Sequence, residues 1–526
     1  MKRSARILAC LGLILASAAS GSEVPQRGGT LHLAFSAELR SIDPAFSFDG
    51  DSIPLTRLLF RCLLDFDDGT GLVPDEARDW SLSPDGKTFT FHLRPGLRFA
   101  HGREVEAEDY IYSLERILNP ATGSPGQTYF LEILGAPEFV AGKAAHVSGL
   151  RAPDNQTLII ELSRPSFTFR YVLAMAFASA VPREIVQRYG RDFQYHLSGS
   201  GPYRLAEFRR GIRWRFDRNP FYTGPLGFVD AVDVMFGPDD ALMLMMLDRG
   251  DLDQVVASVA QAIQSRRDPR RRDWLQFVES PELDYFFMNT EVKPFDDPRV
   301  RQAVNYAIDK ERLLKLVGGL AVVAHGVVPP SIPWSNPTLP DYSHDPAKAR
   351  ALLREAGFPN GFKTQLWYGV DAHLFARLAE GIQQDLAQVG IDAELQSASY
   401  AAFQTKTETR GQAPCGVYGW TQDYPDPSDF LDVLLNGERI TDTDCNNASF
   451  YNNPEVNRRL DAAAQSMDPA ERTRLFREGE DLIMRDAPWV PLVHEHIPVL
   501  YHPRVHGANP HPVWLWRYER MWIKPR

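Results

Sequence analysis

Strict alternation of apolar and polar residues in the first half of the chain predicts β-strands. From Lys87 to Leu93, phenylalanine and leucine alternate with threonine and histidine, directly after a Pro-Asp-Gly turn at 84–86. This is the period of a half-buried strand that follows a turn. Residues 157–162 predict a second strand, and residues 203–216 predict a hairpin that bends at Gly211. The first half is therefore expected to be rich in strands.

Helix starts in the second half share one signal, an Asp or Asn followed by proline. It occurs at Asp297-Pro298, Asp345-Pro346, Asn453-Pro454 and Asp468-Pro469. The first residue can cap the helix, and the proline suits the first helical position. Residues 345–357 add an apolar stripe and a glycine stop. Strands predicted at 363–368 and 391–395 alternate with these helices, which indicates an α/β lobe.

The N-terminus has the pattern of a secretory signal peptide, which we place at residues 1–20. Three basic residues precede the apolar stretch Ile7–Ala16, and small residues follow at 17–20. The apolar stretch is shorter than the roughly 20 residues of a membrane-spanning helix. We expect the mature chain to begin near Gly21. Lipid modification at Cys10 is an alternative, although cleavage there would leave almost no apolar region.

Composition narrows the class of protein. The net charge is -11 and the basic residues are dispersed, so neither nucleic acid nor a polybasic membrane contact is expected as a partner. The basic run Arg266–Arg272 is interpreted as a solvated loop. The apolar run Tyr171–Val181 has eleven residues and ends at Pro182, too short to span a membrane. We expect a soluble mature protein.

Six segments resemble the large substrate-binding proteins of ATP-driven peptide and nickel importers, called solute-binding protein family 5. The segments are Gly29 to Pro44, Trp80 to Ile117, Gly199 to Arg204, Pro298 to Lys310, Ala379 to Ile391 and Gly419 to Asp426. They occur in family order across nearly the whole mature chain. The ordered set is a more specific signal than any one segment.

The resemblance implies an α/β fold of the periplasmic-binding-protein type, with two lobes and an additional domain inserted in the first lobe. Lobe I would comprise residues 21–72, 199–280 and 497–526. The additional α+β domain would comprise residues 73–198, and lobe II residues 281–496. The resemblance also implies a periplasmic, monomeric protein without a cofactor, which delivers its ligand to the membrane permease subunits of an ABC importer.

The resemblance places the ligand site in the segment from Gly419 to Asp426. In peptide-binding relatives the aspartate that matches Asp423 pairs with the ligand's α-ammonium group, and the backbone before it pairs with the ligand like an added strand. A charge-assisted hydrogen bond of this kind contributes about 1.5–3 kcal/mol, and backbone pairing reads a peptide independently of its side chains. The expected ligand-binding residues are Gly419, Trp420, Thr421, Asp423 and Tyr424, with Phe48, Asp49 and Gly50 facing them across the cleft.

Four aspartates recur at every third position, which also fits a metal-binding run or a helix face. They are Asp423, Asp426, Asp429 and Asp432. Prolines 425 and 427 prevent one helix from holding all four. The run lacks the glycine and terminal glutamate of a calcium loop. Asp423 is therefore the favoured ligand anchor, and Asp429 is explained by a nearby helix start.

The chain departs from the family at the ligand's carboxylate. Dipeptide-binding relatives use an arginine shortly before the helix that matches residues 377–389, but residues 367–373 contain no arginine. Oligopeptide-binding relatives can carry an arginine at the position of Val417. An oligopeptide is therefore favoured over a dipeptide as the ligand. The same fold binding a nickel chelate, haem, an opine or a glycan is the alternative.

The sequence His494-Glu495-His496 is a candidate metal site, because two imidazoles and a carboxylate are good zinc or nickel ligands. No third ligand segment is evident, and the position resembles the crossover between lobes. A metal-dependent hydrolase that uses both histidines is the alternative from another class. The usual catalytic motifs of hydrolases and nucleotide-binding enzymes are absent from the sequence, so we expect a binding protein and not an enzyme.

Three cysteines follow the signal peptide: Cys62, Cys415 and Cys445. An oxidising compartment permits one disulfide among them, and the odd number leaves one thiol free. Cys415 and Cys445 flank the expected ligand segment, so we predict this pair. The sequence alone does not determine the connectivity.

Overall fold

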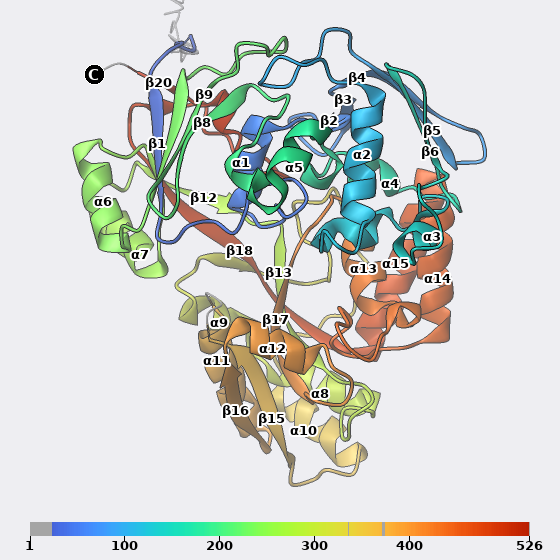
Figure 1. The fold of residues 1–526 in the computed structure, drawn as a ribbon. Helices are drawn as coiled ribbons and strands as arrows, with labels where there is room; N and C mark the ends of the chain where they lie inside the picture. The colour runs from blue at the N-terminus through green and yellow to red at the C-terminus, as the bar shows by residue number, and fades with distance from the viewer. Residues whose placement is uncertain (1–23, 335, 371–373, 525–526) are drawn as a thin grey trace, which may run out of the picture.

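The computed structural model describes residues 24–334, 336–370 and 374–524. The predicted signal peptide and its cleavage site lie outside these residues. Figure 1 shows an upper body that contains the N-terminal half and the C-terminal end, and a lower body built around β15, β16 and α10. The long strand β18 runs between the two bodies.

The first sheet contains the N-terminal strand of the described chain. Its order is β1 (Thr30–Phe35), β10 (Ala231–Phe236), β9 (Arg213–Arg218) and β8 (Tyr203–Arg209). The hairpin predicted at 203–216 is confirmed, since β8 and β9 pair antiparallel. Gly211 has a φ of 65° in its turn, a conformation that glycine adopts without steric cost.

The second sheet belongs to the expected additional domain. Its order is β4 (Ala77–Leu82), β5 (Thr88–Leu93), β7 (Thr157–Glu161) and β6 (Leu150–Asp154). The strands predicted at 87–93 and 157–162 are confirmed within one residue. Phe89 and Phe91 are fully buried on one face of β5, as the alternation predicts. Helix α2 (Ala107–Leu118) packs near this sheet and contacts β6 and β7.

The third sheet contains eight strands and connects the two lobes. Its main order is β11 (Gln254–Val256), β18 (Trp489–Tyr501), β13 (Glu282–Met288), β17 (Cys415–Thr421), β15 (Phe362–Gly369) and β16 (Ile391–Ala398). Strands β12 (Leu275–Glu279) and β14 (Ala321–Val323) also pair with β18. Residues 489–495 of β18 pair with β13 and β14, and residues 496–501 pair with β11 and β12. The expected boundary after residue 496 therefore falls inside one continuous strand.

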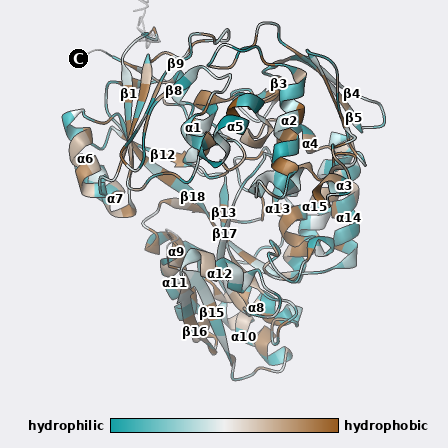
Figure 2. Cartoon of the chain, viewed as in Figure 1, coloured by the Kyte–Doolittle hydropathy of each residue, from teal (hydrophilic) through white to brown (hydrophobic). Residues whose placement is uncertain are grey.

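All four helix starts predicted from Asp or Asn before proline are confirmed. The helices are α8 (Pro298–Ala307), α10 (Pro346–Glu355), α14 (Pro454–Gln465) and α15 (Pro469–Asp486). In each, the side chain of the capping residue accepts a hydrogen bond from a backbone N–H of the first turn, which has no partner within the helix. Figure 2 shows hydrophilic and hydrophobic residues interleaved along helices such as α2 and α14, the pattern of amphipathic helices.

The remaining elements are shorter or cover the sheets. The other helices are α1 (Ser52–Leu59), α3 (Ala136–Val140), α4 (Phe169–Val172), α5 (Arg183–Tyr189), α6 (Asp240–Arg249), α7 (Val259–Arg267), α9 (Lys310–Leu316), α11 (Phe375–Gln388), α12 (Tyr400–Thr407) and α13 (Ser428–Leu435). The 3₁₀ helices are η1 (Pro125–Phe130), η2 (Ala176–Ala178), η3 (Gly190–Tyr195), η4 (Gly437–Arg439) and η5 (Tyr518–Arg520), and the short strands are β2 (Leu64–Phe66), β3 (Leu72–Pro74), β19 (Val505–His506) and β20 (Trp522–Ile523). Within the described residues no helix combines the length and apolarity that crossing a membrane requires.

Buried apolar side chains form three large clusters. The largest draws on residues 283–493, and the second mainly on residues 63–180. The third combines residues 31–60 and 181–236 with residues near the C-terminus. This clustering supports the expected division into lobe II, an additional domain and lobe I, whose exact boundaries stay a prediction.

The predicted disulfide between Cys415 and Cys445 is wrong for this structure. Both residues are buried free thiols, as is Cys62. The sulfur of Cys415 lies 3.1 Å from the carbonyl oxygen of Gln365 on the neighbouring strand, and the sulfur of Cys445 lies 3.6 Å from the carbonyl oxygen of Asn447. Each thiol therefore has its own local acceptor. Spacing along the chain did not reveal that the two side chains point to different partners.

Candidate ligand-binding site

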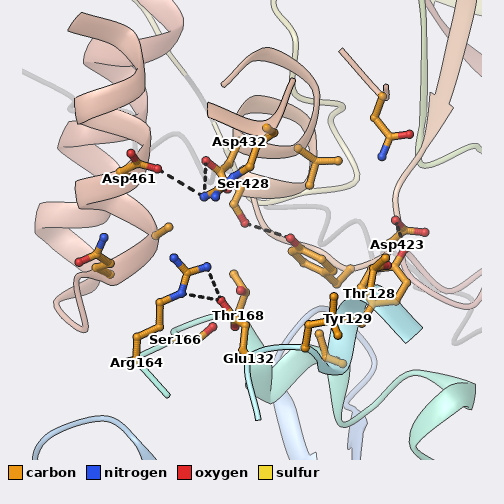
Figure 3. A pocket seen from close by; sticks show the side chains of 18 of the residues that line it. Thr128, Tyr129, Glu132, Arg164, Ser166, Thr168, Asp423, Ser428, Asp432 and Asp461 are labelled. Carbon is orange, nitrogen blue, oxygen red and sulfur yellow. Dashed lines mark hydrogen bonds and ion pairs between the residues drawn. The ribbon is translucent and has the colours of Figure 1, made fainter. Parts of the chain in front are cut away.

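The expected ligand segment lies where β17 ends and α13 begins. Strand β17 pairs with β13 as far as Thr421, and α13 starts at Ser428. Asp423 lies in the intervening turn, at the wall of a cavity of about 660 Å³ between the additional domain and lobe II. Figure 3 shows this cavity with Tyr129 and Thr128 beside Asp423.

The carboxylate of Asp423 is held by a residue from a distant part of the chain. The hydroxyl of Tyr129 donates a hydrogen bond of 2.5 Å to Oδ2 of Asp423. No lysine or arginine among the described residues forms an ion pair with Asp423. Burial raises the pKa of Asp423 to about 6, while the hydrogen bond from Tyr129 acts in the opposite direction. A buried carboxylate that has no cation beside it is stabilised when a cationic group of the ligand binds to it.

The other three aspartates of the run have structural partners. Asp426 accepts two hydrogen bonds, of 2.8 and 2.9 Å, from the guanidinium of Arg472 in a buried ion pair. Asp429 is fully buried and accepts a hydrogen bond of 2.9 Å from the backbone N–H of Asp423. Asp432 lines the cavity and pairs with Arg439 at 3.1 Å. Asp423 is thus the one aspartate of the four that lines the cavity without a cation beside it.

Trp420 and Tyr424, the two aromatic residues of the segment, line the cavity. Trp420 donates its indole N–H to Oδ2 of Asp429 at 3.3 Å, which fixes the ring. Tyr424 is buried and its ring is parallel to that of Tyr171, with centroids 6.3 Å apart and an interplanar angle of 5°. Tyr171 belongs to α4 of the additional domain. The contact between Tyr171 and Tyr424 therefore connects the additional domain to lobe II beside Asp423.

Paired charges also line the cavity wall. Arg164 contacts Glu132 at 2.8 Å, and Arg439 bridges Asp432 and Asp461. Figure 3 shows both groups around the open space. Sequence reasoning missed Tyr129, Glu132, Arg164, Arg439 and Asp461, because they come from η1, η4, α14 and loops that no local motif connects. Only the packing of the additional domain on α13 and α14 brings them together.

Gly419 and Thr421 point away from this cavity. Successive residues of a strand face opposite sides, and of these three residues only Trp420 lines the cavity. In the neighbouring strand β13, Gly419 pairs with Asp284 and Thr421 pairs with Glu282. The side chains of Asp284 and Glu282 therefore lie on the same face of the sheet as Gly419 and Thr421. The segment therefore presents two different faces.

The structure does not bring Phe48, Asp49 and Gly50 to this cavity. None of the three is among the described residues that line it. Asp49 accepts a hydrogen bond of 2.8 Å from the backbone N–H of Ser52, at the start of α1. Phe48 is 45% exposed and lies under the guanidinium of Arg40. Their expected role across the cleft stays a prediction.

His494 of β18 has a structural contact with the neighbouring strand β13. Its Nδ1 lies 3.0 Å from the carbonyl oxygen of Glu282, and burial lowers the pKa of His494 to about 4. Within residues 24–334, 336–370 and 374–524, no group of three or more His, Cys, Asp or Glu side chains is arranged to hold a metal ion. The segment that lacks the expected arginine extends into residues 371–373, which lie outside the described part of the chain.

Solved structures share this architecture. A protein named clavulanic acid biosynthesis oligopeptide binding protein 2 matches with a TM-score of 0.88 and 28% identity, over 95% of this chain and 96% of that one. DppA from Helicobacter pylori, a periplasmic binding protein in complex with the peptide STSA, matches with a TM-score of 0.79 and 27% identity, over 95% of this chain and 99% of that one. The fold is thus the two-lobed fold of periplasmic binding proteins.

Sequence comparison places the chain in one family. The family model for bacterial extracellular solute-binding proteins, family 5 (middle region), matches residues 71–442. The chain belongs to this family, which makes it a substrate-binding protein of the ABC-transport type. It is similar to the glutathione-binding protein GsiB of Salmonella typhi, with 29% identity over 474 residues and 88% of each chain covered.

Proposed function

We propose that this protein captures peptides outside the cytoplasm and delivers them to the permease subunits of an ABC importer. In this proposal Asp423 pairs with the ligand's ammonium group. The observation that carries it is a cavity-lining carboxylate with a raised pKa and no cation beside it in the described structure. An ammonium group placed there would replace the missing counter-charge and favour the ionised form.

We favour an oligopeptide over a dipeptide as the ligand. The cavity volume of about 660 Å³ exceeds what a single ammonium group needs and leaves room for ligand atoms beyond it. The sequence also lacks the arginine that clamps a dipeptide carboxylate in relatives. We further propose that the protein works as an exported monomer and catalyses no reaction.

Contacts between the additional domain and lobe II suggest how binding leads to closure. Tyr129 meets Asp423, and the guanidinium of Arg472 lies 4.1 Å from the ring centroid of Phe167. A ligand stabilises the closed arrangement only by its extra affinity for that arrangement. An ammonium group that bridges Asp423 and the opposite wall would supply this difference.

The decisive experiment measures peptide affinity by calorimetry for the wild type and for Asp423→Asn. The probes are the tripeptide Ala-Ala-Ala and its N-acetylated form. We expect the wild type to bind the free tripeptide at least tenfold more tightly, and Asp423→Asn to lose that difference. Asp392→Asn is the matched control, because Asp392 is an exposed aspartate of lobe II whose side chain is 68% accessible. Wild-type affinity in Asp423→Asn would disprove the assignment.

The alternative is the same fold with a non-peptide ligand, such as a nickel chelate, haem, an opine or a glycan. The missing arginine is the observation that keeps it open, since it removes the usual clamp for a peptide carboxylate. Mass spectrometry of the ligand that co-purifies from the native host distinguishes the two. A peptide series in the bound fraction supports the proposal, and a single non-peptide compound supports the alternative.

A further inference from the structure

The second face of the ligand segment lies against three carboxyl groups. Glu282 and Asp284 are two residues apart on β13, so they share a face, and they pair with Thr421 and Gly419 of β17. Glu495 of β18 acts electrostatically on both of them. In Figure 1 the strands β13, β17 and β18 lie together at the junction between the upper and lower bodies.

The carboxyl groups converge on the space above Gly419. A Cβ atom at Gly419 would lie 2.8 Å from Oδ1 of Asp284 and 3.0 Å from Oε1 of Glu282. It would also lie 3.1 Å from Cζ of Phe375. The absence of a side chain at Gly419 is therefore what lets two carboxyl oxygens and an aromatic edge meet at one point.

Asp284 lacks the donors that a buried carboxylate normally has. It is fully buried, and no backbone or side-chain N–H or hydroxyl group of the described structure donates a hydrogen bond to its oxygens; its hydrogen-bonding neighbour is the carboxyl group of Glu495. Neither Asp284 nor Glu282 forms an ion pair with a described lysine or arginine. Burial and the nearby Glu495 raise the pKa of Glu282 to about 8 and that of Asp284 well above its usual range. Burying Glu282 and Asp284 without a described cation beside them costs free energy, and a cationic group of the ligand would recover part of it.

The surroundings suit a cation. The rings of Phe375 and Tyr400 lie side by side, with centroids 6.4 Å apart. Tyr400 also lies close enough to Glu282 for the carboxylate to contribute to raising its pKa. Carboxylates beside aromatic faces form the usual environment of an ammonium or guanidinium group. Glu282 is half-buried and its strand partner Thr421 is exposed, so the group is approached from the Thr421 side.

We propose that Glu282, Asp284 and Glu495 form a second pocket that binds a basic side chain of the ligand, so that this protein prefers peptides containing lysine or arginine. The inference rests on the proposed function and deepens it. Gly419 and Asp423 are four residues apart, which limits their separation to about 14 Å. A peptide with its ammonium group at Asp423 and a lysine or arginine at its second or third residue spans this distance.

The test uses tripeptides that differ only in charge. Calorimetry compares Ala-Lys-Ala and Ala-Ala-Lys with the same peptides carrying norleucine, and the arginine peptides with their citrulline forms. We expect the wild type to prefer the basic peptides at least tenfold. Glu282→Gln is expected to reduce this preference below threefold, with Asp284→Asn as a second variant and Asp392→Asn as the unaffected control. A thermal unfolding curve checks that each variant folds.

The outcomes separate the two proposals. Equal affinity of the wild type for lysine and norleucine peptides overturns the second pocket and leaves the proposed function standing. If no peptide binds, the proposed function is overturned, and agmatine then tests the pocket by itself. Binding of agmatine to the wild type but not to Glu282→Gln would keep the second pocket, and no binding would overturn both. Should Glu282→Gln fail to fold, the preference of the wild type decides the result.

Discussion

The hydroxyl of Tyr129 donates a hydrogen bond of 2.5 Å to the carboxylate of Asp423, although 294 positions separate the two residues in the chain. Tyr129 belongs to the additional domain and Asp423 to lobe II, so this bond joins the two parts at the cavity. It stabilises the ionised form of Asp423 against the cost of burial.

Peptide affinity is expected to depend on pH through Asp423. The ionised carboxylate is the form that pairs with an ammonium group, and its pKa is about 6. Affinity should therefore be highest near pH 7, fall about tenfold for each pH unit below 6, and begin to fall again near pH 8 as the peptide's α-ammonium group loses its proton. Calorimetry of Ala-Ala-Ala between pH 4.5 and 8 measures this. Residual binding to Asp423→Asn should show no such inflection, and an identical profile in the variant would contradict the assignment.

Removing the Tyr129 hydroxyl should move that midpoint upward. In Tyr129→Phe the carboxylate of Asp423 loses the donor that lowers its pKa, so a larger fraction is protonated at any pH near 6. The same titration measures the shift. Tyr195→Phe is the control, because Tyr195 packs on Phe208 in lobe I. An unchanged midpoint would mean that the hydrogen bond has no influence on ligand binding.

Breaking the Asp426–Arg472 pair should destabilise the fold. Both side chains are buried, and Arg472→Met would leave the carboxylate of Asp426 without its cation. Loss of one partner of a buried pair costs about 3–5 kcal/mol. Chemical denaturation of the wild type and of Arg472→Met measures the difference. Arg474→Met is the control on the same helix, since the side chain of Arg474 is 58% accessible. A loss of less than 1 kcal/mol would disprove a structural role for the pair.

Glu282→Gln should stabilise the protein at high pH. Glu282 has a folded pKa of about 8, above its usual value of 4.5, so burying it costs nothing at pH values below 4.5 and increasingly more as the pH rises toward 8. The neutral amide avoids this cost. The free energy of unfolding should rise by on the order of 1–3 kcal/mol at pH 8, with the gain vanishing near pH 4.5. Chemical denaturation of the wild type and of Glu282→Gln at pH 8 and pH 4.5 tests this prediction. An equal change in the free energy of unfolding at the two pH values would contradict the raised pKa of Glu282.

The three thiols should be free and slow to react. Burial raises the pKa of Cys62 and of Cys415 to about 12, so little thiolate exists at neutral pH. Alkylation without reductant should label the mature protein at three cysteines only after denaturation. Dithiothreitol should leave the thermal transition unchanged. Mass spectrometry that finds a Cys415–Cys445 bridge would overturn the free thiols of the structure.

Local sequence patterns determined the secondary structure of several segments. The alternation at 87–93 and the Asx-Pro pairs act within a few residues, and β5, α8, α10, α14 and α15 follow from them. Ordered family segments then indicated the two-lobed fold, which the solved structures share. Asp423 was singled out on the same basis.

Only the tertiary structure decided which of the four aspartates lines the cavity without a cation beside it. Arg472, Arg439 and Tyr129 reach this segment from separate elements, and no local pattern encodes such contacts. The cysteine pairing failed for the same reason, because neighbours in space depend on strand register and not on spacing. Short-range propensities thus determined the elements, whereas long-range packing determined burial, counter-charges and therefore the chemistry of the site.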